Sequence, residues 1–290
     1  MTKQPLLAID NLTVSFQTET GKLVAVDGLS LRLQPGECVA IVGESGSGKS
    51  VTAMSILGLT AFNGGSVDGG SLRLERRDGG VTDLVKVSER VMERIRGDEI
   101  AMIFQEPMTS LNPVFTIGEQ IAEVVRKHRG VGAAEASAAT LRLLKRVRIP
   151  QAETRLRQYP HELSGGMRQR VVIAMALACS PRLLIADEPT TALDVTIQAQ
   201  ILDLLRDLAR QDNMAMLFIT HDMGVVAEIA DRVVVMRHGR KVEEGLTTEL
   251  FEGAIQPYTR QLLAAVPKLG SMASFFGPRA FGDDRPEASE

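Results

Sequence analysis

The chain contains few cysteines and few aromatic residues. Its 290 residues include no Trp and two Cys, Cys38 and Cys179, and aromatic residues make up 4%. Both cysteines lie in apolar segments far apart in the sequence, which indicates reduced, buried thiols rather than a disulfide framework. No CxxC or HExxH metal pattern occurs. No run of eighteen apolar residues occurs either, so we expect no membrane-spanning helix, and the polar opening residues predict no signal peptide.

The chain also lacks an excess of either charge. Its 33 Lys and Arg against 36 Asp and Glu give a net charge of −3, which does not suggest a nucleic-acid partner. A basic cluster at 142–148 is short and indicates the solvated face of a helix. The hydrophobic content of 44% suits one large domain, or a core with a subdomain.

The strongest pattern present is a P-loop, Gly-x-x-x-x-Gly-Lys-[Ser/Thr]. Its members are Gly43, Glu44, Ser45, Gly46, Ser47, Gly48, Lys49 and Ser50. The glycines let the backbone turn tightly and bring its N–H groups onto phosphate oxygens. Lys49 places a charge between the β- and γ-phosphates, and the Ser50 hydroxyl can bind Mg²⁺. An apolar run at 38–42 predicts a buried parallel strand before the loop, and 51–59 predicts a helix whose N-terminus faces the phosphates. The chain is therefore expected to bind a nucleoside triphosphate.

The region before the P-loop is β-rich. Residues 6–16 and 23–33 are predicted strands, and Phe16 lies shortly upstream of the P-loop. An aromatic ring there can stack on adenine or simply pack in the sheet, and the spacing does not decide between these roles. After the P-loop, Gly-rich residues 63–70 predict a loop, and 71–74 and 84–87 predict short edge strands. Residues 88–96 predict a helix with Ser88 as a candidate N-cap.

Polar side chains follow three apolar strands in the second part of the chain. Gln105 follows 100–104, Asp187 and Glu188 end 183–188, and His221 follows 216–220. In α/β sheets ligands gather at the carboxyl ends of the strands, so these side chains are candidates to meet at one site. Asp187 would hold Mg²⁺ and Glu188 would orient a water. A simpler interpretation is open for each: Asp187 and Glu188 can be a capping pair at a strand end, and His221 can be a structural histidine.

Helical patterns separate these strands. Residues 117–147 are strongly helical with an interruption near 130–132, and resemble a lobe inserted into the α/β core. Ser164, Gly165 and Gly166 precede an apolar helix and suit either anion binding or a simple N-cap at Ser164. Residues 194–211 predict an amphipathic helix, and 233–243 predict a hairpin around His238-Gly239.

The order of these motifs resembles the ATP-binding subunit of an ABC transporter over roughly residues 6–265. The motifs are Walker A (43–50), the Q-loop (Gln105), the signature (163–167), Walker B (Asp187 and Glu188), the D-loop (192–194) and the H-loop (His221). The resemblance implies an α/β P-loop cassette with a mostly parallel core sheet, an N-terminal antiparallel β subdomain and an inserted helical lobe. It also implies an ATPase that uses ATP and Mg²⁺.

The same resemblance assigns roles residue by residue. Catalysis would involve Glu188, His221, Gln105 and Lys49, and Mg²⁺ would be held by Ser50, Gln105 and Asp187. Phe16 would stack on adenine, and the P-loop with Val51 would bind the phosphates. Ser164, Gly165 and Gly166 would bind the γ-phosphate of ATP held by a second cassette, and Asp194 of the D-loop is also assigned to nucleotide binding.

A closer likeness is to importers of oligopeptides, dipeptides, glutathione and nickel. It rests on residues 104–113, 165–170, 184–195 and 256–260, and the run 185–191 is similar to the D-type subunit. The implied partners are two integral-membrane permease subunits, a second cassette (F-type or identical) and, indirectly, a periplasmic solute-binding protein, at the cytoplasmic face of the bacterial inner membrane. Many members carry cysteines beyond the Pro-Tyr-Thr segment that hold iron–sulfur. None follows Cys179 here, so no cluster is expected.

The resemblance also predicts how the chain is divided. The cassette would span 1–252, with a core lobe at 1–105 and 164–252 and a helical lobe at 106–163. Residues 253–290 would form a C-terminal extension with a poorly ordered tail after about 272. The alternatives are a non-transport ABC ATPase, a module that holds ATP without hydrolysing it, and a cassette for nickel or another solute. Long coiled-coil insertions that mark the first are absent, and Glu188 with His221 argues against the second.

Overall fold

A six-stranded sheet forms the centre of the molecule. In the computed structural model, which describes residues 4–105, 110–191 and 193–264, the strand order is β10-β9-β3-β8-β7-β6. The strands are β3 (Cys38–Val42), β6 (Ile100–Ile103), β7 (Leu183–Asp187), β8 (Ala215–Thr220), β9 (Arg232–Arg237) and β10 (Arg240–Leu246). All neighbouring pairs are parallel except β9 and β10. The parallel strands therefore end together at one edge of the sheet, which confirms the predicted core.

The parallel strands are apolar along their whole length because both faces of the sheet are covered. In β7, Leu183 and Ile185 pack into the core on one side, while Leu184 and Ala186 pack into the core on the other. Successive side chains of a strand point to opposite faces, so a strand buried on both faces needs an unbroken apolar run. The five residues of β3 are likewise all buried.

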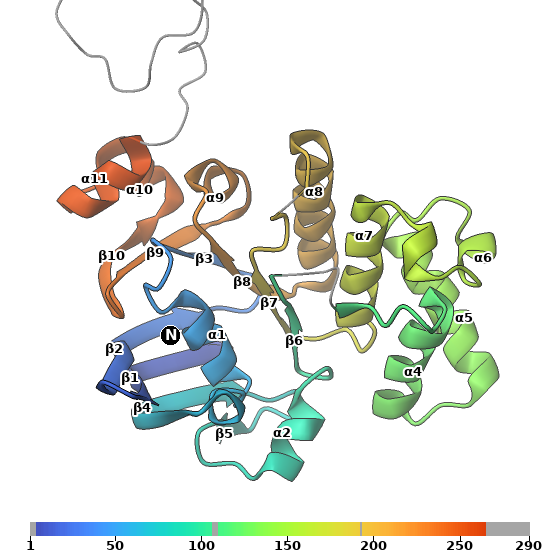
Figure 1. The fold of residues 1–290 in the computed structure, drawn as a ribbon, viewed down its shortest axis with the longest axis horizontal. Helices are drawn as coiled ribbons and strands as arrows, with labels where there is room; N and C mark the ends of the chain where they lie inside the picture. Colours follow the sequence, from blue (N-terminus) through green and yellow to red (C-terminus); the bar gives the residue numbers. More distant parts are fainter. Residues whose placement is uncertain (1–3, 106–109, 192, 265–290) are drawn as a thin grey trace, which may run out of the picture.

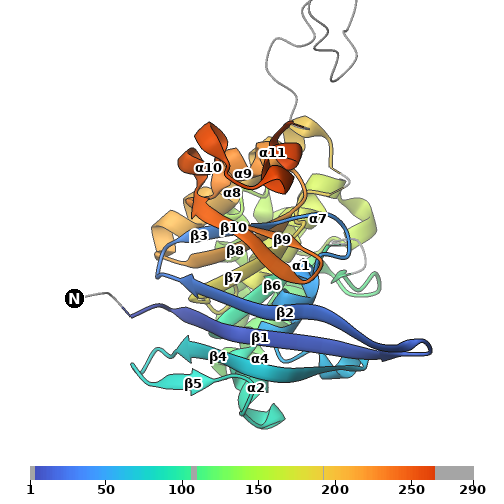
Figure 2. The ribbon, with the colours of Figure 1, turned by 90° about the vertical axis from the view of Figure 1, so that its left-hand side faces the viewer.

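A second, antiparallel sheet contains the N-terminal part of the chain. Its order is β2-β1-β4-β5, formed by β1 (Leu7–Thr18), β2 (Gly21–Leu33), β4 (Gly65–Glu75) and β5 (Val81–Asp83). Figure 2 shows this sheet stacked against the parallel one, with α1 (Lys49–Ile56) between them. The antiparallel β subdomain predicted from the sequence is thus confirmed.

Two local predictions in this sheet were wrong. Residues 65–70 belong to β4 rather than to a loop, because their backbone pairs with β1 from Phe16 opposite Gly65 to Thr13 opposite Gly69. Residues 84–87 form a turn rather than a strand. The carboxylate of Asp83 accepts a hydrogen bond from the Val85 N–H, and its carbonyl accepts one from the Lys86 N–H, which turns the chain. The helix after this turn, α2 (Glu89–Ile95), has Ser88 at its N-cap without a side-chain capping bond.

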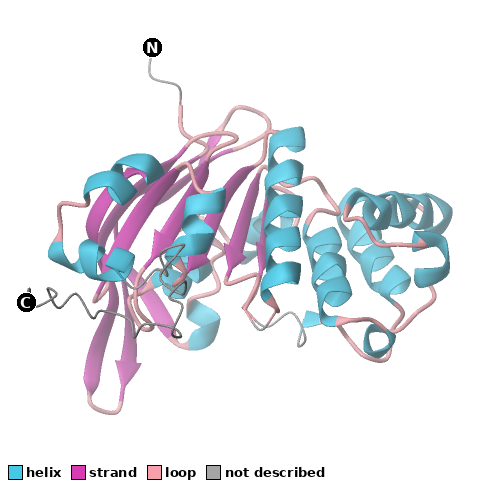
Figure 3. Cartoon of the chain, turned by 90° about the horizontal axis from the view of Figure 1, so that it is seen from above, coloured by secondary structure: helices cyan, strands magenta, loops and turns pink. Residues whose placement is uncertain are grey.

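Most of the remaining helices lie beyond the β6 edge or over one face of the parallel sheet (Figures 1 and 3). The group beside β6 contains α4 (Ile117–Arg129), α5 (Ala133–Arg146), α6 (Ala152–Arg155), η2 (Pro160–Glu162) and α7 (Gly165–Ala176). The others are η1 (Ala61–Asn63), α8 (Val195–Asp212), α9 (Met223–Ile229), α10 (Thr247–Gly253) and α11 (Pro257–Ala264). A helical group inserted between β6 and β7 agrees with the predicted fold class, while the predicted limits of the helical lobe, 106–163, stay a prediction. Residues 106–109, residue 192 of the D-loop and the tail after 272 lie outside the described residues.

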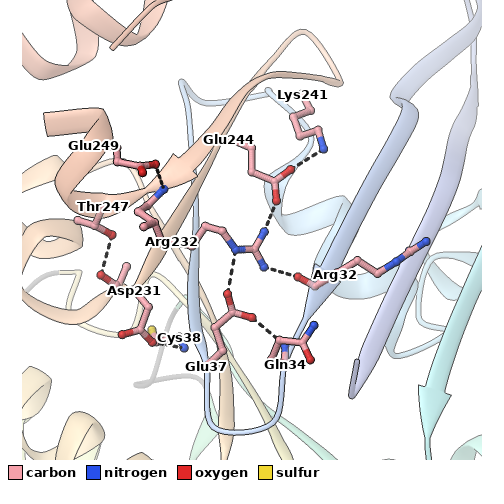
Figure 4. A network of polar contacts seen from close by, with 12 residues as sticks. Arg32, Gln34, Glu37, Cys38, Asp231, Arg232, Lys241, Glu244, Thr247 and Glu249 are labelled. Atoms are coloured by element: carbon pink, nitrogen blue, oxygen red, sulfur yellow. Dashed lines mark hydrogen bonds and ion pairs between the residues drawn. The ribbon is translucent and has the colours of Figure 1, made fainter. Parts of the chain in front are cut away.

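A polar network ties the two sheets together at the end of β9 that lies away from the strands' carboxyl edge. The Arg232 guanidinium pairs with Glu37 and Glu244 and donates to the carbonyl of Arg32 on β2 (Figure 4). Nearby, the Cys38 N–H donates to the carboxylate of Asp231 at 2.8 Å. These contacts fix β3 relative to β2 at this end of the sheet. The other end of β3, where the P-loop begins, is thereby held in place.

Candidate functional site

A cavity of about 650 Å³ opens at the carboxyl edge of the parallel sheet. Its lining comprises Phe16, Leu23, Ala25, Ser45, Gly46, Ser47, Gly48, Lys49, Ser50, Val51, Gln105, Glu188 and His221. These residues come from the antiparallel sheet, the P-loop and the ends of three parallel strands. The fold therefore brings together most of the site residues predicted from separate parts of the sequence.

The P-loop backbone has a shape that two of its glycines make possible. Gly43 has a φ of 151°, and a Cβ there would lie 2.1 Å from the Met236 carbonyl oxygen. Gly48, at a φ of 99°, would place a Cβ 2.5 Å from the Ala25 carbonyl oxygen. Side chains are excluded at both positions by conformation and by space. The loop then runs into α1, whose N-terminal N–H groups and dipole favour an anion.

Lys49 lies in the loop with its side chain directed back at the backbone. Its Nζ donates to the Gly43 carbonyl at 2.7 Å and to the Glu44 carbonyl at 2.9 Å. Burial lowers the pKa of Lys49, while the charges of Glu188 and Asp187 act in the opposite direction. The ammonium group is thus held beneath the loop by neutral acceptors, from where it can face a phosphate.

Asp187 ends β7 and is 5% exposed. Burial raises the pKa of this carboxyl, a hydrogen bond from Ser50 opposes the rise, and the neighbouring charge of Glu188 adds to it. Its Oδ1 and the Oγ of Ser47 are buried and hydrogen-bond to nothing in the described part of the chain. Buried polar atoms without hydrogen-bond partners are rare, and these two lie where a bound ligand would supply the missing partners.

The Asp187 carboxylate and the Ser50 hydroxyl are suited to hold Mg²⁺ that is bound together with a nucleotide. Carboxylate and hydroxyl oxygens are suitable ligands, and Mg²⁺ at such sites typically uses one or two protein groups plus phosphate oxygens and water. No group of three or more His, Cys, Asp or Glu side chains placed to hold a metal occurs among residues 4–105, 110–191 and 193–264.

Glu188 is the centre of the polar contacts in the cavity. Its Oε2 accepts from Gln105 Nε2 and from Thr191 Oγ1, both at 3.0 Å, and its Oε1 lies 2.9 Å from Nδ1 of His221. Burial by itself raises the pKa of this carboxyl. The hydrogen bonds from the surrounding side chains outweigh burial and hold the pKa of Glu188 below its usual value. Glu188 is therefore an ionised acceptor at neutral pH.

The backbone also sets the position of Glu188. Its N–H donates to the Ile219 carbonyl of β8 at 2.9 Å, and its φ is 47°, in the left-handed region. Non-glycine residues occupy that region at an energetic cost, which surrounding contacts must offset. The side chain thereby turns out of the strand toward Gln105 and His221.

Phe16 lines the outer part of the cavity with Leu23 and Ala25. A Cβ at Gly65, opposite Phe16 in the sheet, would come within 2.7 Å of the Phe16 ring. Because Gly65 has no side chain, the Phe16 ring can occupy that space while Phe16 still lines the cavity. Stacking on adenine remains a prediction that this placement supports.

Gly43 and Glu44, at the start of the P-loop, do not line this cavity, and four predicted nucleotide-binding residues outside the P-loop do not line it either. Ser164 caps α7 by accepting from the Met167 N–H at 3.4 Å, and Gly165 and Gly166 form the first turn of that helix. Asp194 caps α8 by accepting from the Ile197 N–H at 3.0 Å. In the single chain Ser164 and Asp194 act as helix caps, and the roles of all four residues toward a second nucleotide stay predictions.

Three residues with contacts at the site were not singled out from the sequence. Thr191 donates to Glu188, Gln169 of α7 donates to the Pro189 carbonyl at 2.6 Å, and Tyr258 of α11 accepts from the Glu44 N–H at 3.0 Å. Thr191 lies within the Walker B stretch and could have been included by position. Gln169 and Tyr258 lie within 165–170 and 256–260, two of the stretches that carry the resemblance, but their contacts join separate segments and could not be predicted from either stretch. No helix in the described part of the chain is long and apolar enough to span a membrane.

Comparison with known proteins gives a consistent picture. The family described as ABC transporter matches residues 26–191. The glutathione import ATP-binding protein GsiA of Escherichia coli O1:K1 is 57% identical over 276 residues, covering 95% of this chain and 44% of GsiA. A putative peptide import ATP-binding protein of Brucella ovis is 57% identical over 270 residues, covering 93% of this chain and 80% of that protein. The chain thus spans less than half the length of GsiA.

Solved structures with the same fold are more distant in sequence. The dimeric ATP-binding cassette MJ0796, in a post-hydrolysis state bound to ADP and Pi, has a TM-score of 0.72 at 28% identity, covering 83% of this chain and 98% of that one. The cbiO1 cassette of Clostridium perfringens, part of the cbiONQ transporter complex, has a TM-score of 0.72 at 26% identity, covering 86% and 92%.

Proposed function

The chain belongs to the ABC transporter family of ATP-binding proteins, and from that premise we propose that it is the ATP-hydrolysing subunit of an importer for peptides or glutathione. The observation that carries the proposal is the arrangement at one sheet edge of the P-loop, Lys49 and an ionised Glu188 held by three side chains. The substrate class follows from the relatives, which are named as glutathione and putative peptide import proteins.

The residues divide the chemistry between binding and hydrolysis. The P-loop amides and Lys49 bind the β- and γ-phosphates. Glu188 accepts a hydrogen bond from the attacking water and polarises it, while His221 and Gln105 hold the carboxylate in place. Water oxygen then bonds to the γ-phosphorus as the bond to the bridging oxygen breaks, which releases ADP and phosphate.

Mg²⁺ would be held by Asp187, Ser50 and Gln105. When bound, it neutralises charge on the phosphate oxygens. The buried, unpartnered Oδ1 of Asp187 supports this placement, as does the position of Ser50 in the cavity lining. Gln105 also donates to Glu188, so its amide group can face the metal and the catalytic carboxylate at once.

A second cassette is part of the proposal. The α7 N-terminus with Ser164, Gly165 and Gly166 lies outside the chain's own cavity, and Val195 beside Asp194 is 84% exposed. An apolar side chain that exposed, next to an anion-binding helix end, suits a face covered by a partner. The similar cassette MJ0796 is a dimer in its solved structure. Two chains would then enclose two nucleotides head to tail.

We place the contact with the two membrane subunits at a second cavity, of about 320 Å³. It lies where β6 and α2 meet α7, between the core sheet and the helical group, and is lined by Leu57, Leu59, Arg96, Gly97, Ile100, Ala101, Met102, Phe104, Ser110, Val172, Met175 and Ala176. Phe104 is 46% exposed beside Gln105, so a helix of a permease seated here would contact the strand end that carries a catalytic residue. The chain would thus be peripheral at the cytoplasmic face of the inner membrane. The division into core lobe, helical lobe and C-terminal extension is part of the same proposal.

The proposal is tested by two substitutions in the full chain, with and without its permease. Lys49→Ala removes the side-chain charge that the P-loop directs at the phosphates and is expected to lose most nucleotide affinity. Glu188→Gln keeps the shape and one acceptor but removes the charge that polarises water. It is expected to bind ATP nearly normally and to slow hydrolysis about 10²- to 10⁴-fold in single-turnover assays.

Distinct results would contradict distinct parts of the proposal. Normal binding and hydrolysis by Lys49→Ala would show that the P-loop assignment is wrong. Wild-type hydrolysis by Glu188→Gln in the assembled transporter would remove Glu188 from its catalytic role. A chain that hydrolyses ATP but restores no uptake of peptide or glutathione to a strain lacking its own cassette would overturn the substrate class alone.

A further inference from the structure

We infer that Tyr258, on the last described helix, is a positioning residue for the P-loop, and that α11 is therefore part of the ATP site. The inference rests on the proposed function, in which this loop binds ATP. It concerns a segment that lies beyond both the cavity lining and the region matched by the family, residues 26–191. Its evidence is a set of contacts that lead from α11 to Lys49.

The first contact joins α11 to the second residue of the P-loop. The Glu44 N–H donates to the Tyr258 hydroxyl at 3.0 Å, although the two residues are 214 positions apart. Tyr258 is 5% exposed, so its hydroxyl has a fixed position. The N–H groups of a P-loop ordinarily serve phosphate, and this one is instead bound from behind by the protein. The contact fixes the peptide of Glu44 before any ligand arrives.

The second contact leads from the same residue to the catalytic lysine. The Glu44 carbonyl accepts from Lys49 Nζ at 2.9 Å, and the Gly43 carbonyl accepts from it at 2.7 Å. Glu44 therefore makes one hydrogen bond to Tyr258 through its N–H and one to Lys49 through its carbonyl. A shift of this residue would move the acceptors that hold the ammonium group under the phosphates.

The position of Tyr258 is itself determined by its surroundings. Its side chain belongs to a buried apolar cluster with Val42, the residue before the P-loop, and Val235 of β9. The Arg237 guanidinium lies 4.6 Å from the centre of the Tyr258 ring, a distance at which a cation is attracted to the ring face. The ring is thus packed on its apolar side and covered by a charge.

The start of α11 is anchored as well. The carboxylate of Glu243 on β10 accepts from the Ile255 N–H at 2.7 Å and the Gln256 N–H at 3.1 Å. Arg260 donates back to the Ala254 and Ile255 carbonyls at 3.0 and 2.7 Å. These bonds hold the turn before α11 to the edge strand β10. Tyr258 therefore lies on a helix whose start is fixed by hydrogen bonds.

The test is Tyr258→Phe, which removes the hydroxyl and keeps the ring, its packing and its contact with Arg237. We expect the Kd for a fluorescent ATP analogue and the KM for ATP to rise together, about two- to tenfold, as for one lost hydrogen bond. The kcat is expected to stay within about twofold, because Glu188 and its partners are untouched. Tyr159→Phe is the matched control, since it deletes the same group from the chain's other tyrosine, which is 39% exposed, lies directly before η2 and does not line the P-loop cavity.

A second variant and a second measurement separate positioning from stability. Arg237→Met loosens the ring without touching its hydroxyl, and a smaller rise of Kd in the same direction is expected. A purely structural role would lower the melting temperature of the nucleotide-free protein and leave the Kd unchanged, and that result would overturn the inference. If Tyr258→Phe binds like wild type while Lys49→Ala does not bind, the inference fails and the proposed function stands. If the wild type itself does not bind ATP, the proposed function fails first.

Discussion

The position of Glu188 is fixed by an unusual backbone angle and by several hydrogen bonds. It has a φ of 47°, its N–H extends the ladder to β8, and its carboxylate accepts from Gln105 and Thr191 and contacts His221. The strain of such a backbone conformation is of order 1–3 kcal/mol and persists only where surrounding contacts determine it. The sequence predicted that Gln105, Glu188 and His221 would share one edge, because each follows an apolar strand. It did not predict how their side chains would pair.

The two cysteines allow a prediction that concerns single side chains. Burial raises the pKa of Cys38, and the carboxylates of Asp231 and Glu37 raise it further; burial also raises the pKa of Cys179. A raised pKa keeps a thiol protonated at pH 8, and only the thiolate is a nucleophile. We expect no reaction of the native chain with Ellman's reagent at pH 8 within minutes, and release of two equivalents after unfolding.

Rapid labelling of either thiol in the native state would show that its burial is not maintained in solution. A Cys38→Ser variant would identify which thiol had reacted. The same preparation tests for iron, since two cysteines cannot supply the four thiolates that a common iron–sulfur cluster requires. Stoichiometric iron and sulfide in protein purified without oxygen would contradict that expectation.

Among the elements, β4 shows how tertiary pairing overrides local sequence. Its first half is Gly- and Ser-rich and has low strand propensity, yet it pairs with β1 along the sheet. Gly65 is needed there because the Phe16 ring occupies the place of a side chain. A pattern within a short stretch of sequence does not show that a strand fifty residues away will pair with it. The strongly periodic elements, α4, α5 and α8, were predicted correctly because their apolar faces are local patterns.

Helix α4 begins with a capping box that can be tested by itself. Thr116 accepts from the Glu119 N–H at 3.2 Å, and the Glu119 carboxylate accepts from the Thr116 N–H at 2.9 Å. Thr116→Ala is expected to cost about 1 kcal/mol of the free energy of unfolding, and to lower the melting temperature by about 2–4 °C. Thr154→Ala, at an exposed position of α6, is the control and is expected to change stability little. Equal effects of the two would show that the box does not stabilise α4.

For the whole molecule, the position of Ser164 determines the expected assembly. The α7 N-terminus has no nucleotide to bind within its own chain, since it lies outside the cavity. We expect a monomer without nucleotide and weak dimerisation with ATP, measured by light scattering. Glu188→Gln is expected to strengthen the dimer, because in the proposed assembly ATP would bridge the two chains and its hydrolysis would be needed for opening.

A Ser164→Arg variant is a control for this assembly, since it places a bulky charge at the expected interface without altering the P-loop. It is expected to bind ATP as the wild-type monomer does and to form no dimer. A stable dimer of the wild type in the absence of nucleotide would count against the arrangement. The Tyr258 contact illustrates what the sequence could not reveal at this scale, because it joins residues 214 positions apart.

The position of β3 in the middle of its sheet has a consequence for the time course of synthesis. Val39 pairs with Leu217 on one side and Arg232 on the other, 178 and 193 residues later in the chain. At ribosomal rates of about 5–20 residues per second, the strand before the P-loop waits roughly ten to forty seconds for its neighbours. The antiparallel sheet, whose pairings between β1, β2 and β4 lie within residues 7–75, can close long before that. The nascent chain thus carries an unpaired, wholly apolar strand through most of its translation, and its nucleotide pocket is among the last features to form.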